Sequence, residues 1–203
     1  MLIDISMPIK NGSVFRLGTP PIEISTRTFH HALEGEYQTA MLTLPAHAAT
    51  HIDLAWPGIH IDLERMFGVG RLIDVTNQTD GCISVSDYDD WAEVREGDFV
   101  FFRTGWSKFA DTEKYYRHPE LGGDVIRWLI SRKVGAVGID ALGLGRDSKH
   151  GEYDRMLAQS NILVIENLAN LAAIPTSTFS VFCLPLSIEN VDATPARIIV
   201  ATG

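Results

Sequence analysis

Short apolar runs of strand length recur along the chain, and polar turn residues separate them. The runs are rich in β-branched and aromatic residues and are bounded by Gly, Pro, Asp or Asn, which is the pattern of β-strands in a folded domain. This pattern predicts nine strands, at residues 2–5, 22–26, 41–44, 72–75, 99–103, 134–139, 162–165, 180–184 and 197–201.

Three segments between these strands predict helices. Ser86 is a candidate N-cap for a helix that stops at Gly97, and apolar residues spaced i, i+3 and i+4 indicate a second helix at residues 125–132. A third helix is expected at residues 153–159. The chain contains no internal repeat, low-complexity tract or Gly/Ser-rich linker, so we expect one α/β domain over residues 1–203.

Composition and charge exclude several classes of function. Hydrophobic residues make up 45% of the 203 positions, which excludes disorder, and a formal net charge of −9 disfavours nucleic acid as a partner. No apolar stretch approaches the roughly 20 residues of a membrane helix, and residues 1–4 lack the basic start of a signal peptide. Two cysteines, Cys82 and Cys183, are too few for a disulfide framework, so we expect a cytoplasmic protein with Cys183 as a buried thiol.

Two of the seven histidines stand in the most informative segment of the chain. His47, His51 and Asp53 lie within seven residues that carry no other charge. On an extended backbone, His51 and Asp53 project to the same side about 7 Å apart at Cα, so both can bind one ion at roughly 2.0 to 2.2 Å. His47 reaches the same ion if the small residues 48–50 allow the chain to bend. The segment therefore predicts a metal centre.

A fourth candidate ligand is His60, which follows the turn-forming residues 56–58. Nitrogen and oxygen ligands suit zinc, manganese or iron, and three protein ligands leave a position open for water. The alternative is a set of ordinary hydrogen-bonded histidines near a sheet edge, without metal. We expect His30, His31 and His118 to lie at the surface without a functional role.

The segment resembles the signature of the cyclase family of metal-dependent hydrolases, which includes bacterial kynurenine formamidase and isatin hydrolase. The family pattern reads His-x-Gly-Thr-His-x-Asp-x-Pro-x-His, and His47, Thr50, His51 and Asp53 match it in register. Further segments that resemble family landmarks follow in family order over most of the chain, at residues 4–6, 103–106, 138–140, 166–168 and 194–197.

The resemblance implies one or two bound ions, zinc or manganese. In the family, the first two histidines and the aspartate hold one ion, while the aspartate, a third histidine and a distant glutamate hold a second. Carried over, that glutamate is Glu166, which follows the strand pattern of residues 162–165. The local sequence equally allows a first-turn glutamate that is favoured by a helix dipole.

Three positions depart from the family pattern. The motif glycine is Ala49, which restricts the backbone at the bend. Pro57 stands at the position of the third histidine, so His60 reaches an ion only through a longer loop. The family histidine that assists proton transfer corresponds to Asp154, with His150 four residues earlier, and either side chain is a candidate acid or base.

The resemblance implies hydrolysis of an amide, cyclic amide or ester/lactone bond in a small aromatic or cyclic substrate, by a metal-activated water. Phe15, Trp56 and Trp106 are candidates for the substrate pocket, although each fits a core equally well. A second hypothesis is a catalytically silent metal-binding member of the family that serves as a scaffold or ligand-binding protein. The resemblance also implies a swivelling β/β/α fold, a central mixed β-sheet flanked by helices, and assembly as a homodimer or homotetramer.

Overall fold

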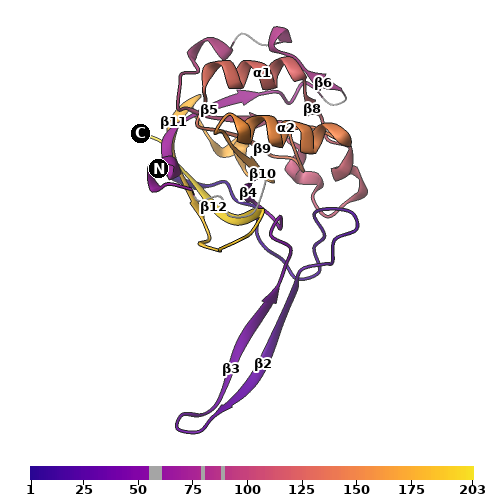
Figure 1. Cartoon of the computed structure of the whole chain (residues 1–203), viewed down its shortest axis with the longest axis vertical. Coiled ribbons are helices and arrows are strands. Elements are labelled where there is room, and N and C mark those ends of the chain that lie inside the picture. The colour runs from indigo at the N-terminus through magenta and orange to yellow at the C-terminus, as the bar shows by residue number, and fades with distance from the viewer. Residues whose placement is uncertain (55–60, 79–80, 88–89) are drawn as a thin grey trace.

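The computed structural model describes residues 1–54, 61–78, 81–87 and 90–203. Within these residues, seven strands close into a mixed barrel in the order β12, β11, β5, β7, β9, β10, β4 and back to β12 (Figure 1). The neighbours β5–β7, β7–β9 and β9–β10 are parallel, and the other pairs are antiparallel. The strands are β4 His51–Asp53, β5 Phe67–Asp74, β7 Phe99–Arg103, β9 Ala136–Ile139, β10 Leu163–Glu166, β11 Thr178–Pro185 and β12 Ala193–Ala201.

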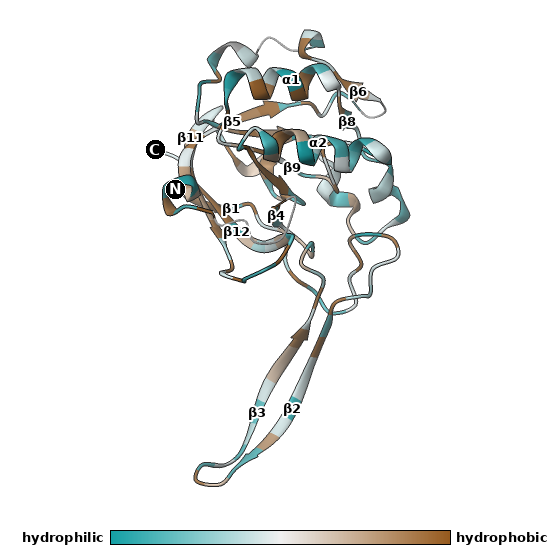
Figure 2. Cartoon of the chain, in the orientation of Figure 1, coloured by the Kyte–Doolittle hydropathy of each residue, from teal (hydrophilic) through white to brown (hydrophobic). Residues whose placement is uncertain are grey.

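Three of the parallel strands, β7, β9 and β10, are buried on both faces. In β7, Phe99 and Phe101 belong to the cluster that fills the barrel, whereas Val100 and Phe102 pack outward under two helices. These helices, α1 (Gly123–Arg132) and α2 (Ser148–Gln159), share one core cluster with the outer residues of the strands, so both cover the same outer face. Figure 2 shows the resulting hydrophobic band through the centre of the body.

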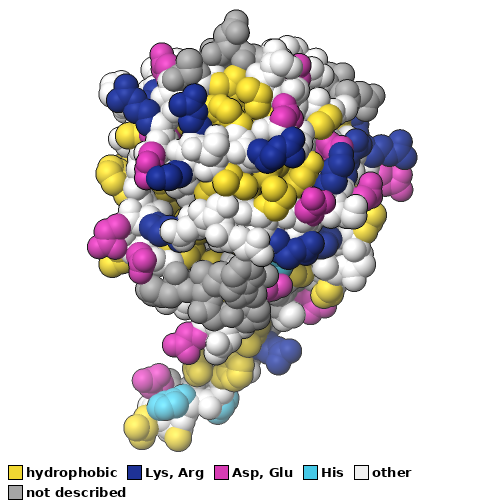
Figure 3. All heavy atoms as spheres, turned by 45° about the horizontal axis from the view of Figure 1, so that its top comes forward, with side chains coloured by type: hydrophobic (Ala, Val, Ile, Leu, Met, Phe, Trp, Pro, Cys, Tyr) yellow, Lys and Arg dark blue, Asp and Glu magenta, His cyan; other side chains and the backbone are white. Residues whose placement is uncertain are grey.

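A two-stranded arm extends far from this body (Figure 1). It consists of β2 (Glu23–His31) and β3 (Gly35–Thr43), paired antiparallel over their whole length, and every residue of both strands is exposed. Figure 3 shows the arm as a narrow projection that carries histidine side chains. An isolated two-stranded ribbon is at best marginally stable in water, so the arm lacks the burial that stabilises the barrel strands.

Short elements complete the fold. β1 (Leu2–Asp4) pairs with the last residues of β12, and β6 (Cys82–Ile83) pairs with β8 (Glu120–Leu121). The 3₁₀ helices are η1 Leu63–Met66, η2 Val85–Asp87, η3 Asp90–Glu93, η4 Trp106–Phe109, η5 Glu113–Arg117 and η6 Leu171–Ala173. None of the helices in the described ranges is long and apolar enough to cross a membrane.

Most expectations for the elements are confirmed. Each of the nine predicted strands overlaps an observed strand, and α1 and α2 match two of the predicted helices, although α2 begins five residues earlier. The helix expected after Ser86 is wrong, because the described residues there form the two 3₁₀ helices η2 and η3. The short strand β4, which carries His51 and Asp53, was not among the nine.

The expected single-domain α/β fold is confirmed at the level of its class. The sheet, however, is a closed barrel with both α-helices on one outer face, where a central sheet flanked by helices in a swivelling β/β/α arrangement was expected. The difference arises at β4, which pairs with β10 on one side and with β12 on the other and so joins the two ends of the sheet.

Candidate metal centre

The side chains of β4 and β10 alternate between the barrel interior and α2. Ile52 and Ile165 are opposite each other and pack inside the barrel. Because alternate side chains in a strand face opposite ways, His51, Asp53 and Glu166 face outward, and His51 stands directly opposite Glu166. His51 Nε2 lies 3.4 Å from Asp53 Oδ1 and 3.5 Å from Glu166 Oε2.

His47 joins this group because the chain bends sharply before β4. Ala49 adopts a left-handed backbone conformation with φ +53°, and Thr50 Oγ1 donates a hydrogen bond to the carbonyl oxygen of Asn167. His47 Nε2 consequently lies 3.2 Å from Asp53 Oδ1. The expected bend between His47 and His51 is therefore confirmed.

A second group of donors comes from α2. His150 and Asp154 are four residues apart on one face of the helix, and His150 Nε2 lies 3.6 Å from Asp154 Oδ2 and 3.8 Å from Glu166 Oε1. The position of the His150 ring depends on Gly143, because a Cβ at residue 143 would lie 2.3 Å from His150 Nδ1. In each of the two groups, His47–His51–Asp53 and His150–Asp154–Glu166, the ligand atoms all lie within 4.8 Å of one another.

The donor atoms fit a divalent cation. Two ligand atoms on a tetrahedral ion at roughly 2.1 Å are about 3.4 Å apart, which matches the observed spacings between 3.2 and 3.8 Å. Among the described residues, four buried side-chain atoms of the two groups lack a hydrogen-bond partner: His51 Nε2, Asp53 Oδ2, Asp154 Oδ1 and Glu166 Oε1. Buried polar atoms normally find partners, so this arrangement is more consistent with ion ligands than with histidines placed for packing.

Comparison with known proteins agrees with this geometry. The family described as Putative cyclase matches residues 3–146. The chain belongs to this family. It is 24% identical to a kynurenine formamidase of Bacillus cereus, over 98% of this chain and 96% of the relative. It is 22% identical to an isatin hydrolase of Roseibium aggregatum, over 90% and 82%.

A solved structure of the same kind shares the whole fold. It is described as a potential metal-dependent hydrolase with cyclase activity, and it superimposes with a TM-score of 0.81 at 27% identity, covering 100% of this chain and 99% of that structure. The closed barrel is thus common to this cyclase-family chain and to a protein described as metal-dependent.

Buried hydrogen bonds hold His51 in one orientation. The Ala49 carbonyl oxygen lies 2.9 Å from His51 Nδ1 and also accepts a hydrogen bond from Asn167 Nδ2 at 2.9 Å. Tyr115 donates its hydroxyl to Asn167 Oδ1 at 2.6 Å. A proton on Nδ1 that is directed at a carbonyl leaves Nε2 free to bind an ion, which is the usual arrangement of a metal-ligating histidine. The sequence marked Ala49 at the bend and Asn167 within a family landmark, but it gave neither a positioning role and did not indicate Tyr115.

Burial and neighbouring charge separate the protonation states of the acidic groups. Burial would raise the pKa of Asp53, yet the charge of His51 and the hydrogen bond from His47 hold it well below its usual value. Burial, followed by the negative charge of Asp53, raises the pKa of Asp154 to about 8 and that of Glu166 well above its usual value. Without an ion, Asp154 therefore keeps a proton near neutral pH.

The two histidines next to these carboxyls shift in opposite directions. Burial would lower the pKa of His47, but its hydrogen bond and attraction to Asp53 raise it overall. Burial lowers the pKa of His150. A neutral imidazole is the form that binds metal, so His150 is prepared for that role.

The centre opens into a cavity of about 360 Å³. Its lining includes His47, His51, His150 and Glu166 and adds residues that the sequence did not indicate, among them Arg16, Leu17, Tyr116 and Arg146. Asp192 Oδ2 also lies 4.0 Å from His47 Nε2. No local sequence signal marked these residues, because they come from loops far from the motif.

The aromatic residues predicted to line the substrate pocket lie in different parts of the molecule. Phe15 is buried and lines a cavity of about 260 Å³ next to His47. Trp106 lines a different cavity, and the structure does not bring it together with the ligand groups. His60 and Trp56 lie outside the described residues, so their roles stay predictions.

Three further expectations can be compared with the structure. His118 is buried, not at the surface as expected, and burial lowers its pKa to about 4. His30 and His31 are exposed on the arm, and Cys183 is a buried free thiol, as expected. Glu166 does not open a helix, because it ends β10 and is followed by Asn167 in a left-handed conformation, so the helix-dipole interpretation is wrong.

Proposed function

We propose that this chain is a metal-dependent hydrolase that cleaves an amide, cyclic amide or ester/lactone bond in a small aromatic or cyclic substrate. The observation that carries the proposal is the buried donor set around Asp53 and Glu166, whose atoms without a hydrogen-bond partner suit a bound cation. The names of two relatives, kynurenine formamidase and isatin hydrolase, denote hydrolysis of a formamide and of a cyclic amide.

The residues of the centre have different roles in this proposal. A divalent ion, zinc or manganese, supplies an activated water and polarises the substrate carbonyl when it is bound. His47, His51 and Asp53 hold the first ion, and Glu166 with His150 and Asp154 holds a second when two are present. His60 remains a further predicted ligand.

Asp154 is the first candidate for moving a proton. In the metal-free centre, burial raises the pKa of its carboxyl to about 8, so it is a candidate to hold a proton and deliver it to the leaving nitrogen or oxygen. His150 Nε2, 3.6 Å away, is the alternative carrier. Phe15 and the cavity beside His47 provide an apolar wall for a ring-bearing substrate.

The test measures metal content and hydrolysis in the same preparations. We expect wild-type protein loaded with zinc or manganese to retain at least one ion per chain and to hydrolyse an N-formyl aromatic amine, isatin or an aromatic lactone. His51→Ala should reduce bound metal below about a tenth of an ion per chain and abolish hydrolysis, whereas His30→Ala on the exposed arm should change neither.

Two outcomes contradict the proposal in different ways. Loaded wild-type protein with less than about a tenth of an ion per chain overturns the metal centre itself. One ion or more without hydrolysis of any of the three substrates supports the catalytically silent scaffold or ligand-binding protein. Asp154→Asn then separates the roles, because loss of hydrolysis at full metal content identifies a proton carrier and loss of the second ion identifies a ligand.

We also propose that the chain forms a homodimer, or a homotetramer built from such dimers, through the arm. The arm spans 21 residues, from 23 to 43, which matches the roughly 20 to 30 residues that each partner contributes to a standard interface. Its exposed large apolar side chains are Ile24, Phe29, Leu33, Tyr37, Met41 and Leu42. A second copy offers exposed apolar side chains on the outer face of β5 and β11, where Phe67 contacts Phe182.

A shortened arm tests this assembly. Arg27 and Thr39 are directly opposite, so residues 28–38 can be replaced by an Asn-Gly turn without changing the base of the arm. We expect light scattering to give a dimer or tetramer for the wild type and a monomer for the shortened arm. A monomeric wild type at about 100 μM, or an unchanged mass for the shortened arm, would show that the arm is not the interface.

A further inference from the structure

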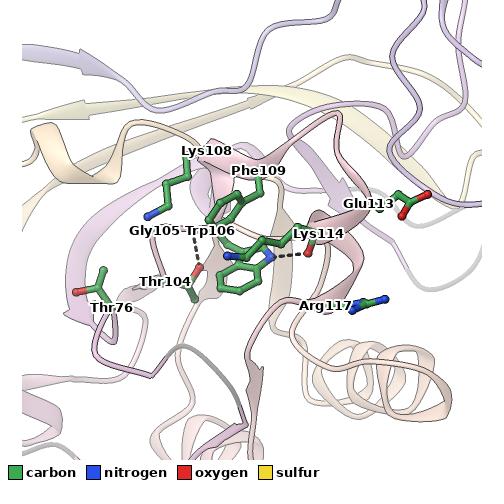
Figure 4. Close-up of a pocket in the computed structure, with 9 residues that line it drawn as sticks. All are labelled: Thr76, Thr104, Gly105, Trp106, Lys108, Phe109, Glu113, Lys114 and Arg117. Atoms are coloured by element: carbon green, nitrogen blue, oxygen red, sulfur yellow. Dashed lines mark hydrogen bonds between the residues drawn. The ribbon is translucent and has the colours of Figure 1, made fainter.

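A second cavity of the described structure is separate from the cavity at the metal centre. It has a volume of about 660 Å³, which is within the usual range for small-molecule sites, and lies between η4 and η5 (Figure 4). We call it the basic pocket, and its lining consists of Thr76, Thr104, Gly105, Trp106, Lys108, Phe109, Glu113, Lys114 and Arg117. Among these described lining residues there is no member of the two ligand groups.

Three cations line the basic pocket without a carboxylate partner. Lys108, Lys114 and Arg117 form no ion pair with any carboxylate in the part of the chain that the structure describes. Some cations elsewhere are paired: Arg71 contacts Asp98 at 2.9 Å and Lys149 contacts Glu120 at 2.8 Å. What distinguishes Lys108, Lys114 and Arg117 is that they gather around one hollow on a chain with a formal net charge of −9.

Aromatic rings hold the two lysines at the hollow. Lys114 Nζ lies 3.9 Å from the ring centroid of Phe109 and 5.2 Å from that of Trp106, and Lys108 Nζ lies 5.1 Å from Phe109. Figure 4 shows both lysine side chains close to these rings, with Glu113 away from Lys108. A cation held over a ring is restricted in orientation, so it loses less entropy when it binds an anion.

The floor of the pocket is rigid. Trp106 is 5% exposed, and its indole N–H donates to the Lys114 carbonyl oxygen, which ties η4 to η5. The backbone N–H groups of Thr104 and Gly105 both donate to the buried carboxylate of Asp140. The cations are thus mounted on a preformed surface, and their charges are the groups left available to a ligand.

We propose that the basic pocket binds a small organic anion through a phosphate or carboxylate group. Lys108, Lys114 and Arg117 contact the oxyanion, because ammonium and guanidinium groups form their strongest hydrogen bonds with such acceptors. The floor around Trp106 and Phe109 accommodates the rest of the ligand. This site is additional to the hydrolytic centre and does not depend on its activity.

The experiment uses full-length protein with the metal centre disabled by His51→Ala, so that anions cannot bind to a metal there. Inorganic phosphate, a nucleoside monophosphate and benzoate are titrated by calorimetry and by fluorescence of Trp106, with Trp106→Phe identifying its signal. We expect saturable binding of at least one anion. Tighter binding of the two phosphate compounds indicates a phosphate ligand, and tighter binding of benzoate indicates a carboxylate ligand. Lys108→Gln/Lys114→Gln should weaken binding roughly tenfold or more.

Matched variants keep the result interpretable. Lys133→Ala removes the same charge from an exposed site outside the pocket, where Lys133 Nζ is 3.7 Å from Glu96, and should leave binding unchanged. Lys114→Met retains the stem that packs on the rings and should still lose affinity, while Lys114→Arg should retain it. Absence of binding for all three anions up to about 10 mM, or equal binding by the double variant, overturns the proposal.

Discussion

Two cross-strand pairs of the same residue types have opposite surroundings in this protein. His51 stands opposite Glu166 across β4 and β10, and His30 stands opposite Glu36 across the arm strands. Their nitrogen-to-oxygen distances are similar, at 3.5 and 3.7 Å. The side chains of the first pair are 1% and 2% exposed, whereas those of the second are 79% and 62% exposed.

The comparison shows that closeness of a histidine and a glutamate does not make a metal centre. In the barrel pair, burial removes water from the donor atoms, and the hydrogen bonds of Asn167 and Ala49 leave His51 Nε2 without a partner. In the arm pair, water solvates both side chains, and an exposed ion pair contributes at most about 1 kcal/mol. Burial together with unsatisfied donors therefore distinguishes the candidate site from the surface pair.

The largest loss of stability expected from a substitution is seen when one phenylalanine of the barrel is compared with one of the arm. Phe101→Ala leaves a cavity inside the barrel and should lower the free energy of unfolding by about 3–5 kcal/mol. Phe29→Ala removes a half-exposed ring from the arm and should change it by less than about 0.5 kcal/mol in dilute, monomeric protein. Urea unfolding measures both, and equal losses would mean that the arm packs as tightly as the barrel.

The next largest effect is on metal affinity. It comes from the hydrogen bonds of Asn167, which have no counterpart at the His30–Glu36 pair of the arm. Asn167→Ala removes the contacts to Tyr115 and Ala49 and should weaken metal binding about 10- to 100-fold, as measured by competition with a chelator. Asn170→Ala is the control, because Asn170 shares the left-handed backbone with φ +56° and is remote from the ligands. A similar loss in both variants would assign the effect to backbone strain instead of positioning.

Two glycine variants near α2 test whether His150 is a metal ligand. Gly143→Ala places a Cβ against His150 and should reduce binding of the second ion about tenfold. Gly151→Ala lies inside α2, where a Cβ meets only the flexible end of Arg155, and should stabilise the protein by about 0.5–1 kcal/mol. Titration with metal and thermal unfolding separate the two outcomes, and unchanged binding in Gly143→Ala would remove His150 from the ligand set.

The pH dependence of metal-free protein follows from the raised pKa of Asp154. Asp154 has a pKa of about 8 when folded and 3.8 as its ordinary value, so between these values the folded state keeps a proton that the unfolded state has lost. This group therefore lowers the free energy of unfolding as pH rises from about 4 to 8. Asp154→Asn should flatten that decline in thermal unfolding, whereas an equally steep decline in the variant would contradict it.

The sequence predicted much of the regular structure, and the errors have identifiable causes. The apolar runs of β7, β9 and β10 were clear because both faces of these strands are buried, as in residues 99–103. The segment after Ser86 has helical spacing but forms 3₁₀ turns, since local periodicity does not determine how a segment packs. His118 was placed at the surface because nothing in its neighbours indicates that the chain folds over it.

The sequence by itself determined the chemistry of the first ligand group, because His47, His51 and Asp53 are local and their spacing limits where they point, although it did not predict the strand β4 that carries two of them. Only the tertiary structure decided that His150 and Asp154 meet Glu166, that the sheet closes through β4, and that the arm stays exposed. These outcomes depend on contacts between segments far apart in the chain. Burial and loss of water, which turn a set of donors into a candidate metal centre, follow from those contacts alone.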